Sequence, residues 1–223
     1  MQPKPINILT IQFANEISQR EIPLFRGAII HSLGNKSILF HNHDGDKFRY
    51  AYPLIQYKRI KGKAAIVCID LGLENISELF TSNIFRCEIG KKTIELRIEN
   101  IHIEQEYIGC TEQENTYRLR HWIPLNTKNY QQYQKTDSLI EKISILEKVL
   151  TGNILSFLKG VTIHQEEMLE INITEISHQQ LSEYKKIRLM TFDIEFHANI
   201  SLPSYIGIGK NASIGYGVLT KIR

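Results

Sequence analysis

The sequence has few cysteines and no long apolar run. Its three cysteines among 223 residues, Cys68, Cys87 and Cys110, form no Cys-x-x-Cys pair and give no indication of a disulfide framework. No stretch approaches the roughly 18 consecutive apolar residues of a membrane-spanning helix. The first residues, Met-Gln-Pro-Lys-Pro-Ile-Asn, lack the apolar segment of a signal peptide. We therefore expect a cytoplasmic protein without a membrane segment.

A large excess of charge of one sign is also missing, since the formal net charge is +3. The distribution of charge is more informative than its sum. From Lys47 to Lys63 no acidic residue interrupts the bases, and Tyr50, Tyr52 and Tyr57 lie between them. Lysine and arginine neutralise phosphate, and tyrosine can stack on an unpaired base. Taken alone, the segment fits a solvated basic face equally well.

The first half of the chain has the periodicities of alternating strands and helices. The hydrophobic pattern predicts strands and helices in the order β-α-β-β-α-β, with an extra segment between residues 34 and 50. The expected elements are a strand at 6–15, a helix at 22–33, a hairpin of 53–60 and 64–71 around Lys61-Gly62-Lys63, a helix at 75–82 and strands within 84–110.

The second half repeats this order, with a strand at 116–125, a helix at 137–158, strands at 168–177 and 184–200, and a last strand at 214–222. A glycine-rich stretch occupies the place of the second helix. The element order predicts an α+β fold of two tandem ferredoxin-like domains. We place the first domain at residues 1–112 and the second at 113–223, with most of its second helix lost.

The glycine-rich stretch covers residues 207–217, Gly-Ile-Gly-Lys-Asn-Ala-Ser-Ile-Gly-Tyr-Gly. Its spacing does not fit a Rossmann loop, and it lacks the closing Gly-Lys-Ser/Thr of a nucleotide-binding loop. Glycines allow the backbone to approach a bulky group closely, and free amides beside Lys210 would suit phosphate oxygens. The alternative is a tight structural loop that packs against a neighbouring helix.

Two histidines lie in a predicted hairpin with a turn at Asp44-Gly45. Residues i and i+2 of a strand share a face, so His41 and His43 are expected side by side. The predicted cross-strand pairs are His43 with Asp46, His41 with Phe48 and Leu39 with Tyr50. Neighbouring imidazoles suit acid–base chemistry near neutral pH.

Other interpretations of the histidine pair remain open. An H-x-H pattern followed by aspartate also begins the metal site of metallo-β-lactamase-fold hydrolases, but Gly45 stands where their aspartate belongs and no further histidine follows. The histidines could equally be ordinary hairpin residues. The letters His-Asn-His do not fit an HNH nuclease, whose histidines and asparagine are widely spaced.

The glycine-rich stretch resembles the loop that marks the RAMP superfamily of CRISPR-associated proteins. It lies just before the C-terminus, as in the repeat-processing endoribonucleases of the family called Cas six, which are built from two ferredoxin-like (RRM-like) domains. The resemblance covers the whole chain. The histidine segment resembles the catalytic region of the type I-B branch, where an H-x-H pair follows the first helix, a lysine lies upstream and a tyrosine lies seven residues after the second histidine. His41, His43 and Tyr50 fit that spacing.

The resemblance implies an endoribonuclease that cuts CRISPR repeat transcripts once per repeat, without a metal or other cofactor, leaving a 2′,3′-cyclic phosphate and a 5′-OH. It implies that His41 and His43 share the roles of general base and acid. Tyr50 would orient the ribose or a histidine. Lys36 would stabilise the phosphate, although it lies closer to the histidines than in the family pattern, which leaves Arg26 and Lys47 as substitutes.

The residues expected to contact RNA are Lys58, Arg59, Lys61, Lys63, Gly207, Gly209, Lys210, Gly215 and Gly217. The expected partners are CRISPR repeat RNA and proteins of a CRISPR effector complex, and the chain is expected to be a monomer or a homodimer. A different class also fits, namely a non-catalytic RAMP subunit that holds RNA in an effector complex. The histidine pair favours the enzyme, because a scaffold does not need it. A metal-dependent hydrolase is the third possibility, and a chelator would inhibit it.

Overall fold

The computed structural model describes residues 3–33, 43–44, 47–48, 52–74, 76, 79–80, 86–89, 92–184 and 187–222. The chain divides into two compact units. The N-terminal unit comprises Pro5–Glu106 with Ser213–Gly215, and the C-terminal unit comprises Met1–Lys4, Tyr107–Ala212 and Tyr216–Arg223. The glycine-rich stretch therefore supplies residues to both units.

The N-terminal unit has the strand order of a ferredoxin-like domain. Its main strands are β1 (Lys4–Glu16), β4 (Ile55–Ile60), β5 (Lys63–Ile69) and the first part of β8 (Ile98–Trp122). They are arranged in the order β4-β5-β1-β8, and β5 runs antiparallel to both β1 and β4. The unit also contains η1, α1, η2 and the hairpins β2–β3 and β6–β7, with bounds Gln19–Glu21, Ile22–Ser32, Asp70–Leu73, His43–Asp44, Lys47–Phe48, Arg86–Ile89 and Lys92–Glu95.

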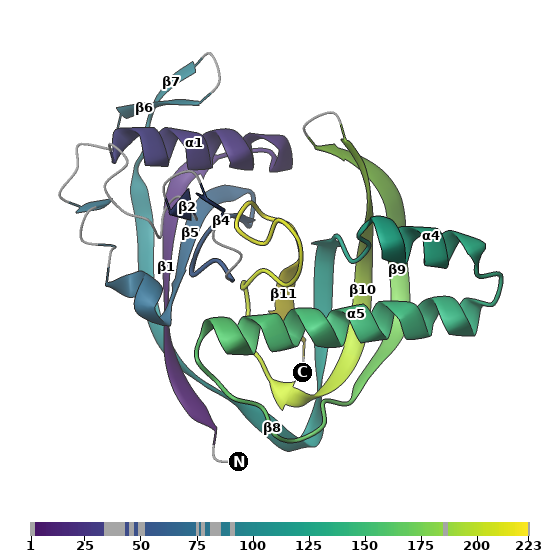
Figure 1. Cartoon of the computed structure of the whole chain (residues 1–223). Helices are drawn as coiled ribbons and strands as arrows, with labels where there is room; N and C mark the ends of the chain where they lie inside the picture. The colour runs from purple at the N-terminus through teal and green to yellow at the C-terminus, as the bar shows by residue number, and fades with distance from the viewer. Residues whose placement is uncertain are drawn as a thin grey trace. The chain divides into compact units, whose positions relative to one another are not determined.

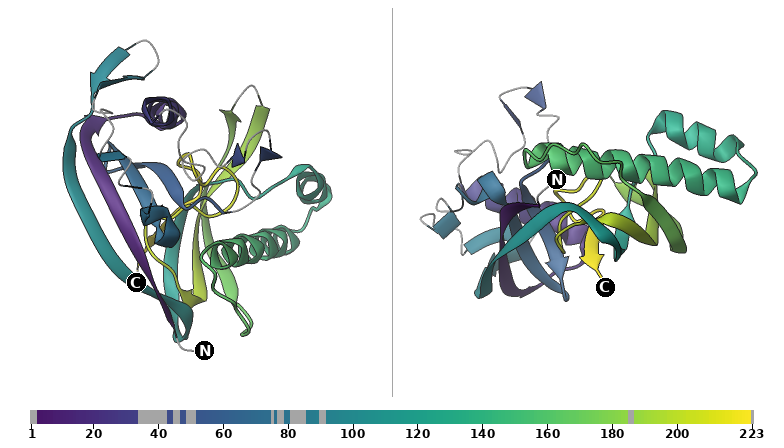
Figure 2. Two further views of the ribbon diagram at one scale, coloured as in Figure 1. Left: turned by 60° about the vertical axis from the view of Figure 1, so that its left-hand side comes forward. Right: turned by 90° about the horizontal axis from the view of Figure 1, so that it is seen from below.

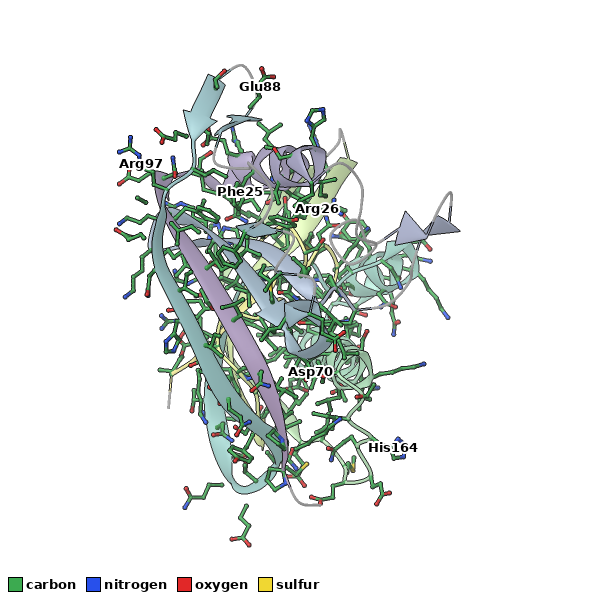
Figure 3. All side chains as sticks on the ribbon, turned by 90° about the vertical axis from the view of Figure 1, so that its left-hand side faces the viewer. Phe25, Arg26, Asp70, Glu88, Arg97 and His164 are labelled. Atoms are coloured by element: carbon green, nitrogen blue, oxygen red, sulfur yellow. The ribbon has the colours of Figure 1, made fainter. Side chains whose placement is uncertain are left out.

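Local sequence explains where α1 begins and which face it buries. The Glu21 carboxylate accepts hydrogen bonds from the Ser18 amide and hydroxyl at 2.8 and 2.7 Å, a capping arrangement that favours helix initiation. Phe25 is fully buried and contacts Phe13 and Tyr57 edge to face, with ring centroids 5.6 and 5.8 Å apart. This aromatic cluster fastens α1 to β1 and β4. Phe25 and its neighbour Arg26 are labelled on α1 in Figure 3.

The C-terminal unit repeats the same topology with different elements. The second part of β8 is followed by α4 (Thr127–Lys135), α5 (Leu139–Gly160), β9 (Ile171–Tyr184), β10 (Ile187–Ser201) and β11 (Val218–Lys221). Its strands are arranged in the order β11-β8-β10-β9. The buried residues Leu146, Leu150 and Ile154 recur at helical spacing and form the inner stripe of α5, which lies beside β9 and β10 (Figure 1).

These two topologies confirm the predicted fold of tandem ferredoxin-like domains. The 25-residue strand β8 is the last strand of the first unit and the first strand of the second (Figures 1 and 2). The helix α4 was not expected. Its N-cap, Asn126, accepts a hydrogen bond from the Asn129 amide, but Tyr133 is its only buried residue, so hydrophobic periodicity could not reveal it.

The glycine-rich loop joins β10 to β11 through backbone contacts closer than a side chain permits. Gly217 has a φ of +58°, and a Cβ there would lie 1.9 Å from the Ile208 carbonyl oxygen. Gly209 has a φ of +90°, and its Cβ would lie 2.6 Å from Asn153 Oδ1, which accepts a hydrogen bond from Trp122 Nε1. The packing therefore requires glycine at both positions. This agrees with the second interpretation of the stretch, a tight structural loop that packs against a neighbouring helix.

The same contacts bear on the expected RNA site. The Gly217 amide donates to the His121 carbonyl at 3.1 Å, so it is not available to a phosphate. Gly207 and Gly215 are buried as well, whereas Gly209 and Lys210 retain solvent exposure. The assignment of these glycines to an RNA-binding site stays a prediction, and the exposed positions are the ones best placed for it.

Replacement of Gly217 by alanine is expected to destabilise the C-terminal unit by at least about 1–3 kcal/mol, because a positive φ and a backbone clash coincide there. Gly152→Ala is the matched control. Gly152 lies within α5 with nothing within 4 Å of the Cβ that alanine would add, and the replacement should raise stability there by about 0.5–1 kcal/mol. Urea unfolding followed by fluorescence of Trp122, the single tryptophan, measures both changes. Equal stability of the two variants would contradict the packing argument.

Candidate active site

The histidine segment forms a hairpin after α1, in a register that differs from the predicted one. His43 of β2 pairs with Phe48 of β3, and Asp44 pairs with Lys47. The prediction that His43 lies opposite Asp46 is therefore wrong, and the partner is displaced by two residues. Lys36, His41 and Tyr50 lie outside the described residues.

The tip of the glycine-rich loop is held within the N-terminal unit. The Tyr57 amide of β4 donates to the Ser213 carbonyl at 2.8 Å, and Gln19 Nε2 donates to the Gly215 carbonyl at 2.8 Å. Gly215 packs directly on Ile22, at the first turn of α1. The loop tip is thereby fixed against β4 and the beginning of α1, the helix that precedes the histidine hairpin.

The buried Tyr57 lies within the electrostatic influence of Arg26 on α1, an arrangement that sequence reasoning missed. Tyr57 is fully buried, so its side chain is not exposed for stacking on a base. Burial raises the pKa of the Tyr57 phenol, and the positive charge of Arg26 on α1 opposes that rise. The phenol therefore stays protonated. Its hydroxyl has no hydrogen-bond partner among the residues that the structure describes. No periodicity in the sequence distinguishes this tyrosine from Tyr52.

The basic segment of β4 and β5 divides into buried and exposed members. Lys58 is fully buried, which does not favour a contact with RNA, and its assignment to the RNA-binding set stays a prediction. Burial lowers the pKa of its ammonium group to about 7. The next residue, Arg59, is exposed on the other face and donates from Nε to the Ile17 carbonyl at 2.7 Å. Lys61 at the hairpin turn is exposed, and Lys63 is half-buried beside Glu99, with an Nζ–Oε1 distance of 2.5 Å.

A separate cavity of about 400 Å³ lies in the C-terminal unit, at the end of α5. Lys159, Thr162 and His164 contribute polar atoms to its wall, and Leu155, Leu158 and Ile163 contribute apolar ones. His164 is labelled in Figure 3. None of the predicted site residues lines this cavity.

Fold and sequence together define a class: a tandem ferredoxin-like protein with a C-terminal glycine-rich loop. A comparison with family models identifies the family. Residues 4–107 match the Cas6b N-terminal domain and residues 109–222 match the Cas6b C-terminal domain. The chain therefore belongs to the Cas6b family of CRISPR repeat-processing proteins.

Individual relatives agree with this assignment. A crystal structure of Cas6b is 28% identical, with a TM-score of 0.89 over 98% of this chain and 100% of that one. A second structure, described as CRISPR RNA processing endoribonuclease Cas6b, is 28% identical with a TM-score of 0.76 over the same shares. An uncharacterised protein of Methanocaldococcus jannaschii is 35% identical over 54% of this chain and 81% of its own length.

Within the described part of the chain, no helix has both the length and the apolar character needed to cross a membrane.

The buried Lys58 makes the stability of the protein depend on pH. An unfolded lysine keeps its proton up to a pKa near 10.5, whereas the folded one releases it above about 7. Because the unfolded state binds more protons between these values, stability should rise with pH, by roughly 1 kcal/mol per pH unit from pH 7 to about 8.5. Lys58→Met should remove this rise and be more stable than the wild type at pH 6.

Urea unfolding followed by far-UV circular dichroism at several pH values measures the difference. Lys61→Met is the control, because Lys61 is exposed at the neighbouring hairpin turn. If the free energy of unfolding rose with pH equally in the wild type and in Lys58→Met, the lowered pKa of a buried Lys58 would be contradicted.

Proposed function

We propose that this protein is a metal-independent endoribonuclease that cleaves CRISPR repeat transcripts within the repeat. The observation that carries the proposal is the match of both halves of the chain to the Cas6b family. A structure that is 28% identical over 98% of the chain is described as a CRISPR RNA processing endoribonuclease. The substrate in this proposal is the repeat RNA of the same genome.

The proposed chemistry is attack by the ribose 2′-hydroxyl on the adjacent phosphate. One imidazole of the pair His41 and His43 takes the 2′-hydroxyl proton as the 2′-oxygen bonds to phosphorus. The other imidazole donates a proton to the 5′-oxygen as the bond from phosphorus to that oxygen breaks. The products are a 2′,3′-cyclic phosphate and a 5′-hydroxyl, so no water or metal enters the balance. Each proton transfer is worth about 10²–10⁴ in rate.

Two further residues complete the proposed site. Lys36 supplies positive charge for the phosphate, whose negative charge grows as the 2′-oxygen adds. Tyr50 orients the ribose or one of the histidines. The hairpin of β2 and β3 supports this grouping, because its pairing brings the strand that contains His43 beside the strand that leads to Tyr50.

The RNA backbone is proposed to contact the exposed members of the predicted basic set. These are Arg59, Lys61 and Lys63 around the β4–β5 hairpin, with Gly209 and Lys210 in the glycine-rich loop. Arg59 and Lys63 already have protein partners in Ile17 and Glu99, whereas Lys61 extends from the turn itself. Lys61 is therefore the sharpest single test of this surface.

Replacement of both His41 and His43 by alanine is expected to lower repeat cleavage by at least about 10²-fold while leaving RNA affinity within a few-fold of wild type. Single-turnover cleavage of a labelled repeat and filter binding measure the two quantities. The control is a double replacement of His164 and His178 by alanine, two exposed histidines of the C-terminal unit. Undiminished cleavage by the His41/His43 variant would refute the site.

The substrate and the buffer test the remaining parts of the mechanism. A single 2′-deoxy sugar at the cut should abolish cleavage and preserve binding, because the nucleophile is missing. Addition of EDTA should leave the rate unchanged, and inhibition by EDTA would favour the metal-dependent alternative. A wild-type protein that binds the repeat but never cuts it would instead be the non-catalytic RNA-binding subunit.

Replacement of Lys61 by alanine is expected to weaken repeat binding and to flatten its salt dependence. Each phosphate contact on single-stranded nucleic acid contributes about 0.7 to the slope of log K against log salt, so the slope should fall by about that amount. Titrations between 50 and 300 mM salt measure it. Lys135→Ala, at the exposed end of α4, serves as the matched control. Identical slopes for the two variants would exclude Lys61 from the interface.

A further inference from the structure

The junction turn, residues 17–21 between β1 and α1, is held by hydrogen bonds along its length. The Ile17 amide donates to the Gly62 carbonyl at 3.1 Å, and the Glu21 amide donates to the Ser18 carbonyl at 3.1 Å. The Ser18 amide in turn donates to the Glu21 carboxylate at 2.8 Å. Because local opening would break several of these bonds together, the turn is a rigid point of the N-terminal unit.

Backbone groups of the junction turn contact the basic β4–β5 hairpin. The Ile17 carbonyl accepts a hydrogen bond from Arg59 Nε at 2.7 Å, and the Ile17 amide reaches Gly62 at the tip of that hairpin. Lys61 precedes Gly62, and the two have φ values of +50° and +88°, as the central residues of a tight hairpin turn do. Since both contacts of the junction turn use backbone groups of Ile17, they persist when a neighbouring side chain is replaced.

The side chain of Gln19 joins the junction turn to the tip of the glycine-rich loop. Gln19 is half-buried, and its Nε2 donates to the Gly215 carbonyl at 2.8 Å. A Cβ at position 215 would lie 3.2 Å from this nitrogen and 2.5 Å from Ile22 Cδ1, so glycine permits the close approach. Among the described residues, no side chain other than Gln19 forms a hydrogen bond with residues 213–215.

We propose that Gln19 is a positioning residue for RNA binding: it fixes the tip of the glycine-rich loop to the same turn that holds the basic hairpin. Lys210 lies three positions before Ser213, and Lys61 lies at the tip of the hairpin. Both lysines are then tied to the junction turn before they bind the backbone of one RNA strand. This inference rests on the proposed function, because it takes the repeat RNA as the ligand, and it adds a residue that does not contact the RNA itself.

The physical basis of the proposal is preorganisation. Two cations that are fixed before the ligand arrives bind it more tightly, because less order is created on association. With the loop tip released, Lys210 would have to be immobilised as it meets a phosphate, and part of its electrostatic gain would be lost. The net effect of one such hydrogen bond on an equilibrium constant is roughly two- to tenfold. That range sets the expected change in RNA affinity when the Gln19 donor is removed.

The chemistry of a carboxamide separates this role from catalysis. Gln19 carries no charge and exchanges no proton near neutral pH, and its Nε2 is already bonded to the Gly215 carbonyl. Loss of the side chain should therefore weaken RNA binding without changing the rate of cleavage once the RNA is bound. A residue that only stabilises the fold would instead lower the melting temperature and leave the affinity of the folded protein unchanged.

Gln19→Met in the full chain keeps the length of the side chain and removes its donor. The dissociation constant of the repeat RNA should rise at least about threefold, and the single-turnover rate at saturating protein should stay within about twofold of wild type. Asn15→Leu is the matched control, because Asn15 Nδ2 donates to the Glu95 carbonyl at 2.9 Å in the same unit, a bond that does not involve the loop. Circular dichroism melts verify folding, and Gln19→Asn, whose carboxamide is one methylene shorter, replaces Gln19→Met if that variant does not fold. Unchanged affinity of the folded variant, or an equal loss in Asn15→Leu, would overturn the positioning role.

A double-mutant cycle identifies the residue through which Gln19 acts. In a Lys210→Ala background, Gln19→Met should weaken binding less than about 1.5-fold, because the loop no longer carries the cation that Gln19 positions. In a Lys61→Ala background the full effect should remain, since backbone groups of Ile17 hold the hairpin. Equal effects in both backgrounds would exclude the proposed coupling. A wild type that does not bind the repeat would refute the proposed function and this role with it, whereas a wild type that binds the repeat no better than Gln19→Met refutes the role of Gln19 alone.

Discussion

The structure depends on the close backbone packing of the glycine-rich loop. The carbonyl of Ile208 lies where a Cβ of residue 217 would be, and the carboxamide of Asn153 lies where a Cβ of residue 209 would be. The loop stands between β10 and β11, where a second helix would be expected in the C-terminal unit. Its tip, Ser213–Gly215, then pairs with Tyr57 in the N-terminal unit. Packing requires glycine at these positions. The positions of the loop that remain exposed are the ones open to contact with RNA.

The sequence could predict the fold because the long strands and the helices α1 and α5 carry hydrophobic patterns. The order of elements indicates ferredoxin-like topology twice, and the observed order β4-β5-β1-β8 and its repeat agree with it. The polar helix α4 escaped detection because only one side chain of it is buried. The partner of His43 differs by two residues from the predicted one. The turn signal at Asp44-Gly45 led to this difference, because Asp44 itself pairs with Lys47.

Burial separates the predicted RNA contacts into exposed and buried residues. A run of bases reads as one surface in the sequence, but neighbouring residues of a strand point to opposite faces. In β4 residues 55–58 are buried on both faces of the strand, so Lys58 is buried, whereas Arg59 beside it reaches solvent. Charge alone cannot distinguish these two residues. The roles of His41, Lys36 and Tyr50 rest on their spacing and on membership of the Cas6b family.

The outer strands of the two sheets are protected against pairing in different ways. On the outer edge of β4 the Tyr57 amide donates to Ser213, so the glycine-rich loop occupies it. Strand β11 has only four residues, too few to offer a long template. On β9 the Ile173 amide donates to the Glu147 carboxylate of α5, and the strand is largely polar. Each of these edges carries one of the protections that soluble sheets use against pairing. The glycine-rich loop therefore covers a sheet edge in addition to meeting its own packing constraint.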